Sequence, residues 1–355
     1  MNTSSQIRWA VLGCGQIAVD KSLHGVLAAK GARLVAIADI LEPRRALALA
    51  LAEKNGQQPK AYGDYREALA DPEVQAVYIS LPTGMHKQAV IDAAKAKKAI
   101  LCEKPLGNSP AEVREMVRAA RENGVPLMTA YMARFSDVFQ KTKELIRNGA
   151  IGKVTFVTSH FSYPCSKYYP PGKPGGWRYT DPLGGGPLLD IGVYLAFGIR
   201  EMLGERIAKV SPLNCDTDAP AGSQVPDTTA AWFMTDKGTP GTFVTTFSHV
   251  GLYVNFFGTK GNITVNDCFY QTPGARLECT TDDGKPPFIL DTKADPNLAH
   301  FDNYRREFEH FSTALLNKTP HSPSAEDVMS DALLLDALKQ NAGSINVPTP
   351  AEFLK

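Results

Sequence analysis

The chain has 355 residues, of which 43% are hydrophobic and 21% are charged, and its formal net charge is +1 at pH 7. This length is more than one ordinary core accommodates and predicts two domains, and the composition is typical of soluble globular proteins. A near-neutral charge without long runs of one sign gives no support for a nucleic-acid or membrane-surface partner. No apolar run approaches the about 18 residues of a membrane span, and no secretory leader is visible. The six cysteines are scattered and fit reduced thiols, so we expect a cytoplasmic protein.

The first 130 residues alternate short apolar segments with helical patterns. Strands are expected at 7–12, 33–38, 76–80, 99–103 and 126–130, and helices at 17–30, 43–54, 86–95 and 110–123. Strands without polar alternation are buried on both faces, which favours a doubly wound parallel sheet. We therefore predict a dinucleotide-binding domain over residues 1–130.

The pattern changes after residue 131. A helix is expected at 135–147 and a strand at 153–162, followed by a loop rich in proline, glycine and aromatic residues. Short strands at 228–235, 242–248, 252–257 and 262–265 predict a mostly antiparallel sheet. Two helices close the chain, the first with an apolar stripe made of Phe301, Tyr304, Phe308, Phe311 and Leu315. We expect a second domain over residues 131–355 for substrate binding and oligomerisation, with its last helix able to pack back on the first domain.

A nucleotide-binding motif follows the first strand. Gly13-Cys14-Gly15-Gln16-Ile17-Ala18 reads G-x-G-x-x-A at the start of a helix. The first glycine permits a tight turn, the second admits a pyrophosphate, and the helix N-terminus supplies N–H groups. Because a strand precedes the motif and a helix follows it, we predict a bound dinucleotide.

An acid at the end of the second strand bears on the choice of cofactor. Asp39 stands where a carboxylate accepts hydrogen bonds from ribose hydroxyls, which favours NAD over NADP. Arg44 and Arg45 lie a few residues further on and leave NADP possible. The alternative for Asp39 is a helix-capping side chain.

Glu103-Lys104-Pro105 closes the fourth expected strand, where side chains point to the ligand crevice of such a sheet. A solvated surface lysine is the alternative for Lys104. The motifs GCGQIA (13–18), PTGMH (82–86), EKP (103–105), WRYTDPLGGGPLLDIGVY (177–194) and GTKGNI (258–263) together resemble the glucose–fructose oxidoreductase / inositol dehydrogenase / MocA (Gfo/Idh/MocA) family over nearly the whole chain.

This resemblance implies an N-terminal Rossmann domain and a C-terminal α+β domain built on a large open, mostly antiparallel sheet. It also implies a nicotinamide-dependent oxidoreductase of sugars or polyols that forms homodimers or homotetramers through that sheet. The Lys104–Pro105 bond is expected to be cis. The cofactor-binding residues expected from motif and resemblance together are Gly13, Gly15, Gln16, Ile17, Asp39, Arg44, Pro82, Thr83, His86, Glu103 and Lys104. For His86, a helix cap is the alternative.

The stretch GGGPLLDIGVY (184–194) carries the expected catalytic groups. Its three glycines allow close approach to the cofactor, and Asp190 and Tyr194 share one face of the helix that follows. A tyrosine has a pKa of about 10, and a nearby lysine ammonium would lower it, so Lys104 and Tyr194 fit as a proton-transfer couple. Asp190 would orient the substrate hydroxyl or keep Lys104 charged. Many relatives carry His at the position of Tyr194, so Lys104 alone remains an alternative acid/base. Asp190 as a satisfied buried carboxylate and Tyr194 as a packing residue are the other alternative.

The resemblance places Tyr131, Arg134, Trp177 and Arg178 at the substrate pocket, with structural roles as the alternative. No pair of histidines has metal-ligand spacing along the sequence, so no metal site is expected. The function predicted is hydride transfer between NAD(P) and a carbinol carbon of a sugar, sugar derivative or polyol. The alternative is a redox-neutral enzyme with tightly bound NAD(P), acting in glycoside cleavage or sugar-to-sugar hydride transfer.

Overall fold

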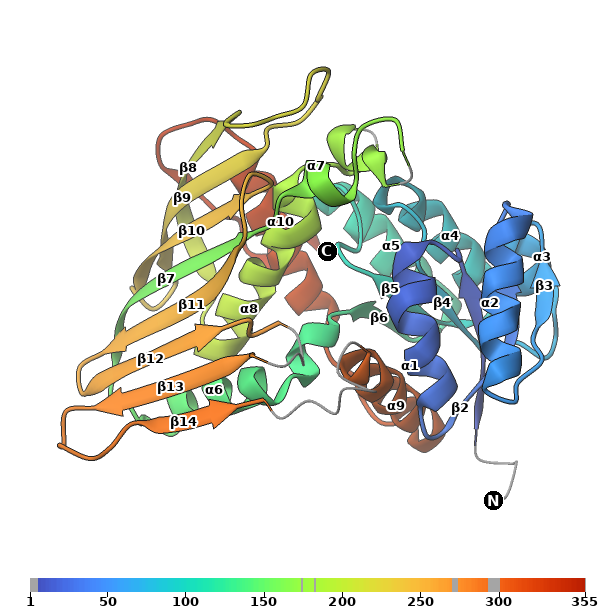
Figure 1. The fold of residues 1–355 in the computed structure, drawn as a ribbon, viewed down its shortest axis with the longest axis horizontal. Coiled ribbons are helices and arrows are strands. Elements are labelled where there is room, and N and C mark those ends of the chain that lie inside the picture. The colour runs from blue at the N-terminus through green and yellow to red at the C-terminus, as the bar shows by residue number, and fades with distance from the viewer. Residues whose placement is uncertain (1–5, 174, 182, 270–273, 293–300, 355) are drawn as a thin grey trace. The chain divides into compact units, whose positions relative to one another are not determined.

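The computed structural model describes residues 6–173, 175–181, 183–269, 274–292 and 301–354. These form two compact units (Figure 1). The first comprises Met1–Gly107, Ala111–Met132 and His300–Val328, and the second comprises Asn108–Pro110, Ala133–Ala299 and Met329–Lys355. The division after residue 132 lies two residues from the expected one. Residues 300–328, expected in the second domain, belong to the first unit.

The first unit is built on a six-stranded parallel sheet, as predicted. Its strands are β1 (Ile7–Leu12), β2 (Ala32–Ala38), β3 (Lys60–Tyr62), β4 (Ala76–Ile79), β5 (Ala99–Glu103) and β6 (Leu127–Ala130), in the order β3-β2-β1-β4-β5-β6. Every residue of β4 and β5 is buried, which explains why both strands are apolar apart from Glu103 at the end of β5. The order changes direction between β1 and β4, and ligands of such sheets bind at that switch point.

Helices connect these strands. They are a π-helical turn (Ala18–Ser22) leading into α1 (Leu23–Ala28), α2 (Glu42–Lys54), α3 (Tyr65–Ala70), α4 (Thr83–Lys95) and α5 (Pro110–Asn123). Helix α4 begins three residues before the expected start, directly after Pro82. A proline, with φ fixed near −65°, suits the start of a helix. The sequence prediction did not use this preference and placed the start too late.

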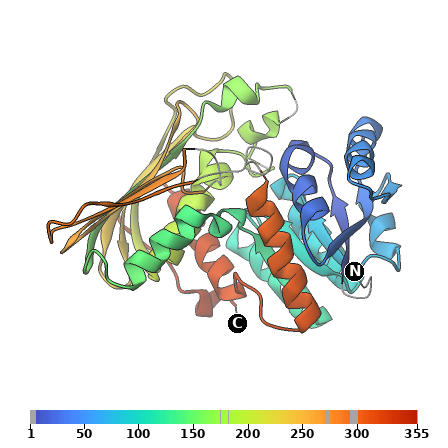
Figure 2. The same ribbon diagram turned by 60° about the horizontal axis from the view of Figure 1, so that its bottom comes forward.

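Helix α9 (Asp302–Asn317) packs against the first unit's sheet and α1 (Figure 2). The ring of Trp9, which is fully buried, lies 5.0 Å from that of Phe308 and 5.9 Å from that of Phe311. Its indole N–H donates to Ser312 Oγ at 3.1 Å. The apolar stripe predicted for this helix therefore supplies core of the first unit.

The second unit is built on a nine-stranded sheet in the order β14-β13-β12-β11-β7-β10-β9-β8-β15. Its strands are β7 (Val154–Ser162), β8 (Ile207–Cys215), β9 (Thr228–Thr235), β10 (Pro240–Thr246), β11 (Gly251–Gly258), β12 (Gly261–Asn266), β13 (Arg276–Thr281), β14 (Phe288–Asp291) and β15 (Ile345–Asn346). Among the described strands of this sheet, only β7 and β10 pair in parallel. The predicted mostly antiparallel sheet is confirmed.

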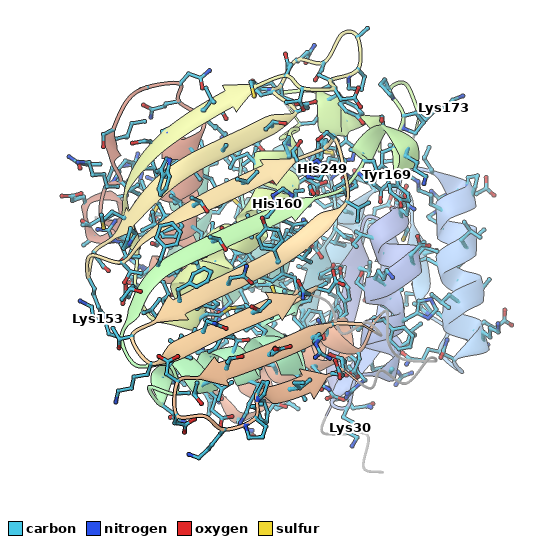
Figure 3. The ribbon with its side chains drawn as sticks, turned by 60° about the vertical axis from the view of Figure 1, so that its left-hand side comes forward. Lys30, Lys153, His160, Tyr169, Lys173 and His249 are labelled. Atoms are coloured by element: carbon cyan, nitrogen blue, oxygen red, sulfur yellow. The ribbon has the colours of Figure 1, made fainter. Side chains whose placement is uncertain are left out.

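Helices α6 (Asp137–Arg147) and α8 (Val193–Leu203) contact strands of this sheet and each other. The remaining elements are helix α10 (Ala325–Leu338) and several short ones: 3-10 turns at Met132–Phe135 and Gly176–Tyr179, α7 (Cys165–Tyr168), a π-helical turn (Leu188–Gly192) and α11 (Pro350–Phe353). Figure 3 shows the opposite face of the sheet, which no drawn helix covers. None of the helices in the described part of the chain has the length and apolar character that a membrane crossing requires.

Candidate functional site

The glycine-rich loop after β1 has the geometry that a dinucleotide needs. Gly13 has φ +96°, and a Cβ there would lie 2.9 Å from the carbonyl oxygen of Ser80, so only glycine fits. A Cβ at Gly15 would meet nothing within 4 Å, so this side of the loop is open. Gln16 and Ile17 are exposed at the start of the helical segment that follows. Open backbone at a helix N-terminus is a site for a phosphate anion, and the residues present fit a pyrophosphate.

The first helix continues as the π-helical turn from Ala18 to Ser22 before it becomes α1. Such wide turns inside helices occur frequently at functional sites. The second unit repeats this combination of glycines and a π-helical turn at Leu188–Gly192.

Asp39 braces the same loop from the end of β2. Its Oδ2 accepts the backbone N–H of Cys14 at 2.8 Å, and its Oδ1 accepts that of Leu41 at 2.8 Å. The N-cap residue of α2 is Leu41, so Asp39 does not cap that helix. A carboxylate has about four acceptor positions, so these two bonds leave capacity for ribose hydroxyls. Arg44 Nη1 lies 3.9 Å from Asp39 Oδ2, and Arg45 Nη1 donates to the Asp39 carbonyl oxygen at 2.6 Å.

Lys104 follows the buried end of β5. The Tyr78 hydroxyl donates a short hydrogen bond to Glu103 Oε1, and Glu103 Oε2 accepts the backbone N–H of Lys104 at 3.1 Å. Burial, together with the charge of Glu103, raises the pKa of Tyr78 well above its usual value, so it remains a donor. The Lys104–Pro105 peptide bond is cis, as predicted. Glu103 therefore holds the backbone that carries Lys104.

His86 is fully enclosed beside this loop, with 1% of its surface exposed. Its Nε2 lies 2.8 Å from the Leu81 carbonyl oxygen, and its Nδ1 lies 3.1 and 3.3 Å from those of Pro105 and Leu106. Burial lowers the pKa of His86. The ring thus ties the start of α4, where Pro82 and Thr83 lie, to the backbone that follows Lys104.

In the second unit, Asp190 is the centre of a polar cluster. Only 8% of its surface is exposed. Its Oδ2 accepts the Tyr163 hydroxyl at 2.6 Å and Nε of Arg178 at 2.9 Å. The guanidinium carbon of Arg178 lies 4.0 Å from the ring centroid of Tyr169 and 4.7 Å from that of Trp177. Two predicted site residues, Asp190 and Arg178, are therefore a buried ion pair.

The charges of this cluster stabilise one another. Burial and the charge of Asp190 raise the pKa of Tyr163, so it stays a neutral donor. Burial lowers the pKa of Arg178, but Asp190 and Tyr163 outweigh this and raise it. The aromatic content of the loop was visible in the sequence, whereas the bond from Tyr163 to Asp190 was not foreseen. The sequence signal for this bond is the position of Tyr163 directly after a strand.

The three glycines before Asp190 allow close approach, but to the loop's own backbone. A Cβ at Gly185 would lie 2.6 Å from the carbonyl oxygen of Arg178 and 2.7 Å from that of Thr180. Gly184 and Gly186 have φ values of +82° and +90°. The glycines thus fold the segment around Arg178, which positions its guanidinium at Asp190.

The other predicted residues are mostly enclosed. Tyr194 is 4% exposed, with its ring centroid 5.4 Å from that of Phe269 and 5.7 Å from that of Phe161. Arg134 Nη2 donates to Glu201 of α8 at 2.9 Å, and Tyr131 is 2% exposed. Lys104 and Tyr131 belong to the first unit, and Arg134, Trp177, Arg178, Asp190 and Tyr194 belong to the second. The convergence of Lys104 with Tyr194 therefore stays a prediction. Among the described residues, no group of three or more His, Cys, Asp or Glu side chains is arranged to hold a metal ion.

Comparison with known proteins gives a consistent assignment. A family described as an oxidoreductase family with an NAD-binding Rossmann fold matches residues 7–131, and the GFO/IDH/MocA C-terminal domain matches residues 139–264. Trans-1,2-dihydrobenzene-1,2-diol dehydrogenase of Mus musculus is 30% identical over 364 residues, covering 98% of this chain and 99% of the relative. D-xylose 1-dehydrogenase (NADP(+)) 2 of Haloferax volcanii is 30% identical over 341 residues, covering 94% and 97%.

Among solved structures, an aldose-aldose oxidoreductase from Caulobacter crescentus has the same fold, with a TM-score of 0.84. It is 23% identical and covers 96% of this chain and 99% of its own. The resemblance seen in the motifs is confirmed by relatives that match along their whole length. The chain therefore belongs to the Gfo/Idh/MocA oxidoreductase family, with an NAD-binding Rossmann fold as its first domain.

Proposed function

We propose that this protein is an NAD(P)-dependent dehydrogenase or reductase that acts on a carbinol carbon of a sugar, sugar derivative or polyol. The observation that carries the proposal is the loop of Gly13 and Gly15, open on one side and braced by Asp39. Relatives of full length named as a dihydrodiol dehydrogenase and a D-xylose dehydrogenase support a diol or sugar substrate.

The nicotinamide cofactor supplies the hydride acceptor or donor. The backbone of Gly13–Ile17 would hold its pyrophosphate, and Asp39 would accept hydrogen bonds from the ribose hydroxyls. We propose NAD as the preferred cofactor because the Asp39 carboxylate repels a 2′-phosphate. NADP remains possible, because the guanidinium of Arg44 could bind the 2′-phosphate. The Arg44→Ala variant tests this: it should weaken NADP binding more than NAD binding in a fluorescence titration, and equal effects would contradict the role of Arg44.

We assign proton transfer to Lys104 and Tyr194, and orientation of the substrate hydroxyl to Asp190. Asp190 is paired with Arg178 and is therefore charged, so it would accept a hydrogen bond from the substrate hydroxyl. Lys104 stands at the end of a buried strand, and its backbone is held by Glu103, which supports a fixed direction for its side chain. Trp177 and Arg178, with Tyr131 and Arg134, are proposed to line the substrate site, and the ring of Trp177 would stack on sugar C–H groups.

The test is a panel of aldoses, inositols and glycosides with NAD and NADP separately, followed by nicotinamide absorbance. We expect turnover with at least one member, loss of turnover in Lys104→Ala, and retained cofactor binding in that variant. The matched control is Lys97→Ala, which changes a lysine in the turn after α4 whose Nζ bonds to Asn123. Turnover that survives Lys104→Ala would contradict the assignment. Stoichiometric nicotinamide in the purified protein without net reduction would instead point to the redox-neutral alternative.

We also propose a homo-oligomer that pairs through the uncovered sheet face (Figure 3). Trp232 is 61% exposed there, and its ring lies 6.0 Å from that of Phe156, which itself lies 6.4 Å from that of Phe257. Exposed apolar clusters of this kind favour association. The Trp232→Glu variant should shift the mass measured by light scattering to that of a monomer. All six cysteines are free thiols, which supports the proposal of a reducing compartment such as the cytoplasm.

A further inference from the structure

Tyr78 is connected through a buried carboxylate to the loop that carries Lys104, although no motif singled it out. It lies on β4, and its side chain is fully buried. Tyr78 is aligned with Leu101 of the neighbouring strand β5, and Glu103 follows two residues further along on the same face. The Tyr78 hydroxyl donates a hydrogen bond to Glu103. We propose that Tyr78 is a positioning residue for catalysis, which acts on Lys104 by keeping the Glu103 carboxylate ionised and in place.

This inference rests on the proposed role of Lys104 in proton transfer. Glu103 connects the two residues through its two carboxylate oxygens. Its Oε1 accepts the Tyr78 hydroxyl, and its Oε2 accepts the backbone N–H of Lys104 at 3.1 Å. Glu103 is 7% exposed, and a buried charge needs hydrogen-bond donors. Because both oxygens are engaged, the direction in which Lys104 leaves the strand depends on the hydroxyl of Tyr78.

The ring of Tyr78 is itself held in the core of the first unit. Its centroid lies 5.2 Å from that of Phe308 on α9, with the two ring planes inclined by 61°. Burial and the charge of Glu103 raise the pKa of Tyr78 well above its usual value. The hydroxyl therefore keeps its proton throughout the pH range of an enzyme assay. A donor that is fixed and always protonated favours the ionised form of a buried carboxylate.

The neighbours of Glu103 on the sheet do not compete with it for a proton near neutral pH. Cys102 is fully buried, and burial together with the charge of Glu103 raises its pKa well above the usual value, so it remains a thiol. On β6, the residue aligned with Glu103 is Ala130, which does not titrate. The charged group next in the chain is the Lys104 ammonium.

Two helices bring further titratable groups to this part of the first unit. From α4, His86 contacts the backbone carbonyl that follows Lys104, and burial lowers the pKa of His86. From α9, Glu307 is fully buried, and its charge acts on Tyr78. A change in pH dependence caused by a substitution at Tyr78 must therefore be assigned by a second substitution at Glu103.

The test begins with Tyr78→Phe, which removes the hydroxyl and keeps the ring. Without this donor the protonated form of Glu103 becomes more favourable, since a carboxylate is stabilised by hydrogen bonds to its charged form. We expect kcat with a sugar substrate to fall about ten- to hundredfold at neutral pH, as for a small misplacement of a reacting group. The profile of kcat/KM against pH should also gain an inflection on its acid side, which a purely structural role would not produce.

The double variant of Tyr78→Phe with Glu103→Gln should lose the new inflection, because glutamine does not titrate. The matched control is Tyr65→Phe, which removes another hydroxyl of the first unit that donates to a carboxylate, that of Asp92 at 2.8 Å. This control should keep the kcat and the pH profile of the wild type. An inflection that persists in the double variant would assign it to a group other than Glu103 and overturn the proposal.

Glu103→Gln alone provides a second test, which does not require Tyr78→Phe to fold. Glutamine keeps the shape of the side chain and removes its charge. We expect a lower kcat at every pH, without a new inflection. A kcat equal to that of the wild type would overturn the requirement for an ionised carboxylate.

Infrared difference spectroscopy of the full-length protein measures the protonation of Glu103 without substrate. On acidification, the carboxylic acid band should appear at a higher pH in Tyr78→Phe than in the wild type, and the double variant should lack this additional signal. A band that appears at the same pH in Tyr78→Phe and the wild type would overturn the proposal. Because this measurement needs no turnover, its failure is distinguishable from failure of the proposed oxidoreductase activity.

Discussion

Replacing Arg178 with methionine should destabilise the second unit strongly, because it removes the cationic partner of a buried carboxylate. Asp190 is 8% exposed, and the Arg178 side chain is 17% exposed. Breaking one side of a buried ion pair costs about 3–5 kcal/mol. The contacts of the guanidinium with the rings of Tyr169 and Trp177 add about 0.5–1 kcal/mol each. Methionine keeps most of the apolar part of the arginine side chain. The loss of unfolding free energy therefore reports the removal of the charge rather than a change in side-chain volume.

The measurement is a double-mutant cycle in urea at pH 7 with Arg178→Met, Asp190→Asn and the double variant. Asp190→Asn keeps the shape of the side chain and removes its charge. We expect the double variant to be more stable than the sum of the single changes implies, by about 2 kcal/mol or more, because residues in direct contact couple. Additivity of the single changes within about 0.5 kcal/mol would refute the reasoning that Arg178 neutralises Asp190.

Three further changes probe the first unit. Phe308→Ala opens a cavity beside the buried ring of Trp9 and should cost about 3–5 kcal/mol of unfolding free energy in urea. Gly25→Ala places a Cβ 2.6 Å from Cβ of Tyr304 and should cost about 1–3 kcal/mol by displacing α9 from α1, measured as a lowered melting temperature. Hydrogen bonding by the backbone N–H of residue 73, together with Lys60 and Tyr62, lowers the pKa of Asp71 to about 2. The folded-state pKa is below the unfolded one, so this stability is present above about pH 4 and is lost as the pH falls towards 2. In Asp71→Asn, the free energy of unfolding should therefore depend less on pH between about pH 4 and pH 2.

Matched controls separate these effects from general sensitivity to mutation. Phe308→Leu should cost less than Phe308→Ala, since most of the volume remains. Gly63→Ala should change little, because a Cβ there meets nothing within 4 Å and φ is not positive. Asp64→Asn changes an exposed carboxylate at the N-cap of α3 and should leave the loss of stability at low pH in place. If the fall of stability below about pH 4 is unchanged in Asp71→Asn, the assignment of this effect to Asp71 is wrong.

The sequence predicted those parts of the fold that depend on buried apolar runs. Strands β1 and β5 fall where the pattern placed them, because both faces of a buried parallel strand select apolar residues. Helix α5 also has the expected bounds. Strand β3 is three residues long and mostly exposed, so it carries no such pattern, and helix α3 has six residues. The apolar stripe between residues 301 and 315 could be recognised from the sequence, but no local pattern indicates which unit that stripe packs against.

Sequence reasoning likewise predicted some features of the candidate site and missed others. The conformation of the glycine loop and the position of Asp39 beside it follow from a motif, and the cis bond before Pro105 was implied by the family resemblance. The partners of Asp190 were not predicted, since Tyr163 lies 27 positions away and reaches it only through the folded loop. The bond from Tyr78 to Glu103 depends on the alignment of β4 with β5, which a single sequence does not reveal.

The partners of Asp190 also narrow its chemical role. A general base must take up a proton during the reaction, and a carboxylate that accepts bonds from Arg178 and Tyr163 is stabilised in its charged form. Under the proposed function, such a carboxylate suits the orientation of a substrate hydroxyl, and the proton transfer is proposed for Lys104 and Tyr194. Asp190→Asn should then lower kcat without moving the pH at which the rate is half-maximal, whereas replacing the true proton carrier should remove that pH dependence. A profile shifted by Asp190→Asn would mean that Asp190 itself carries the proton.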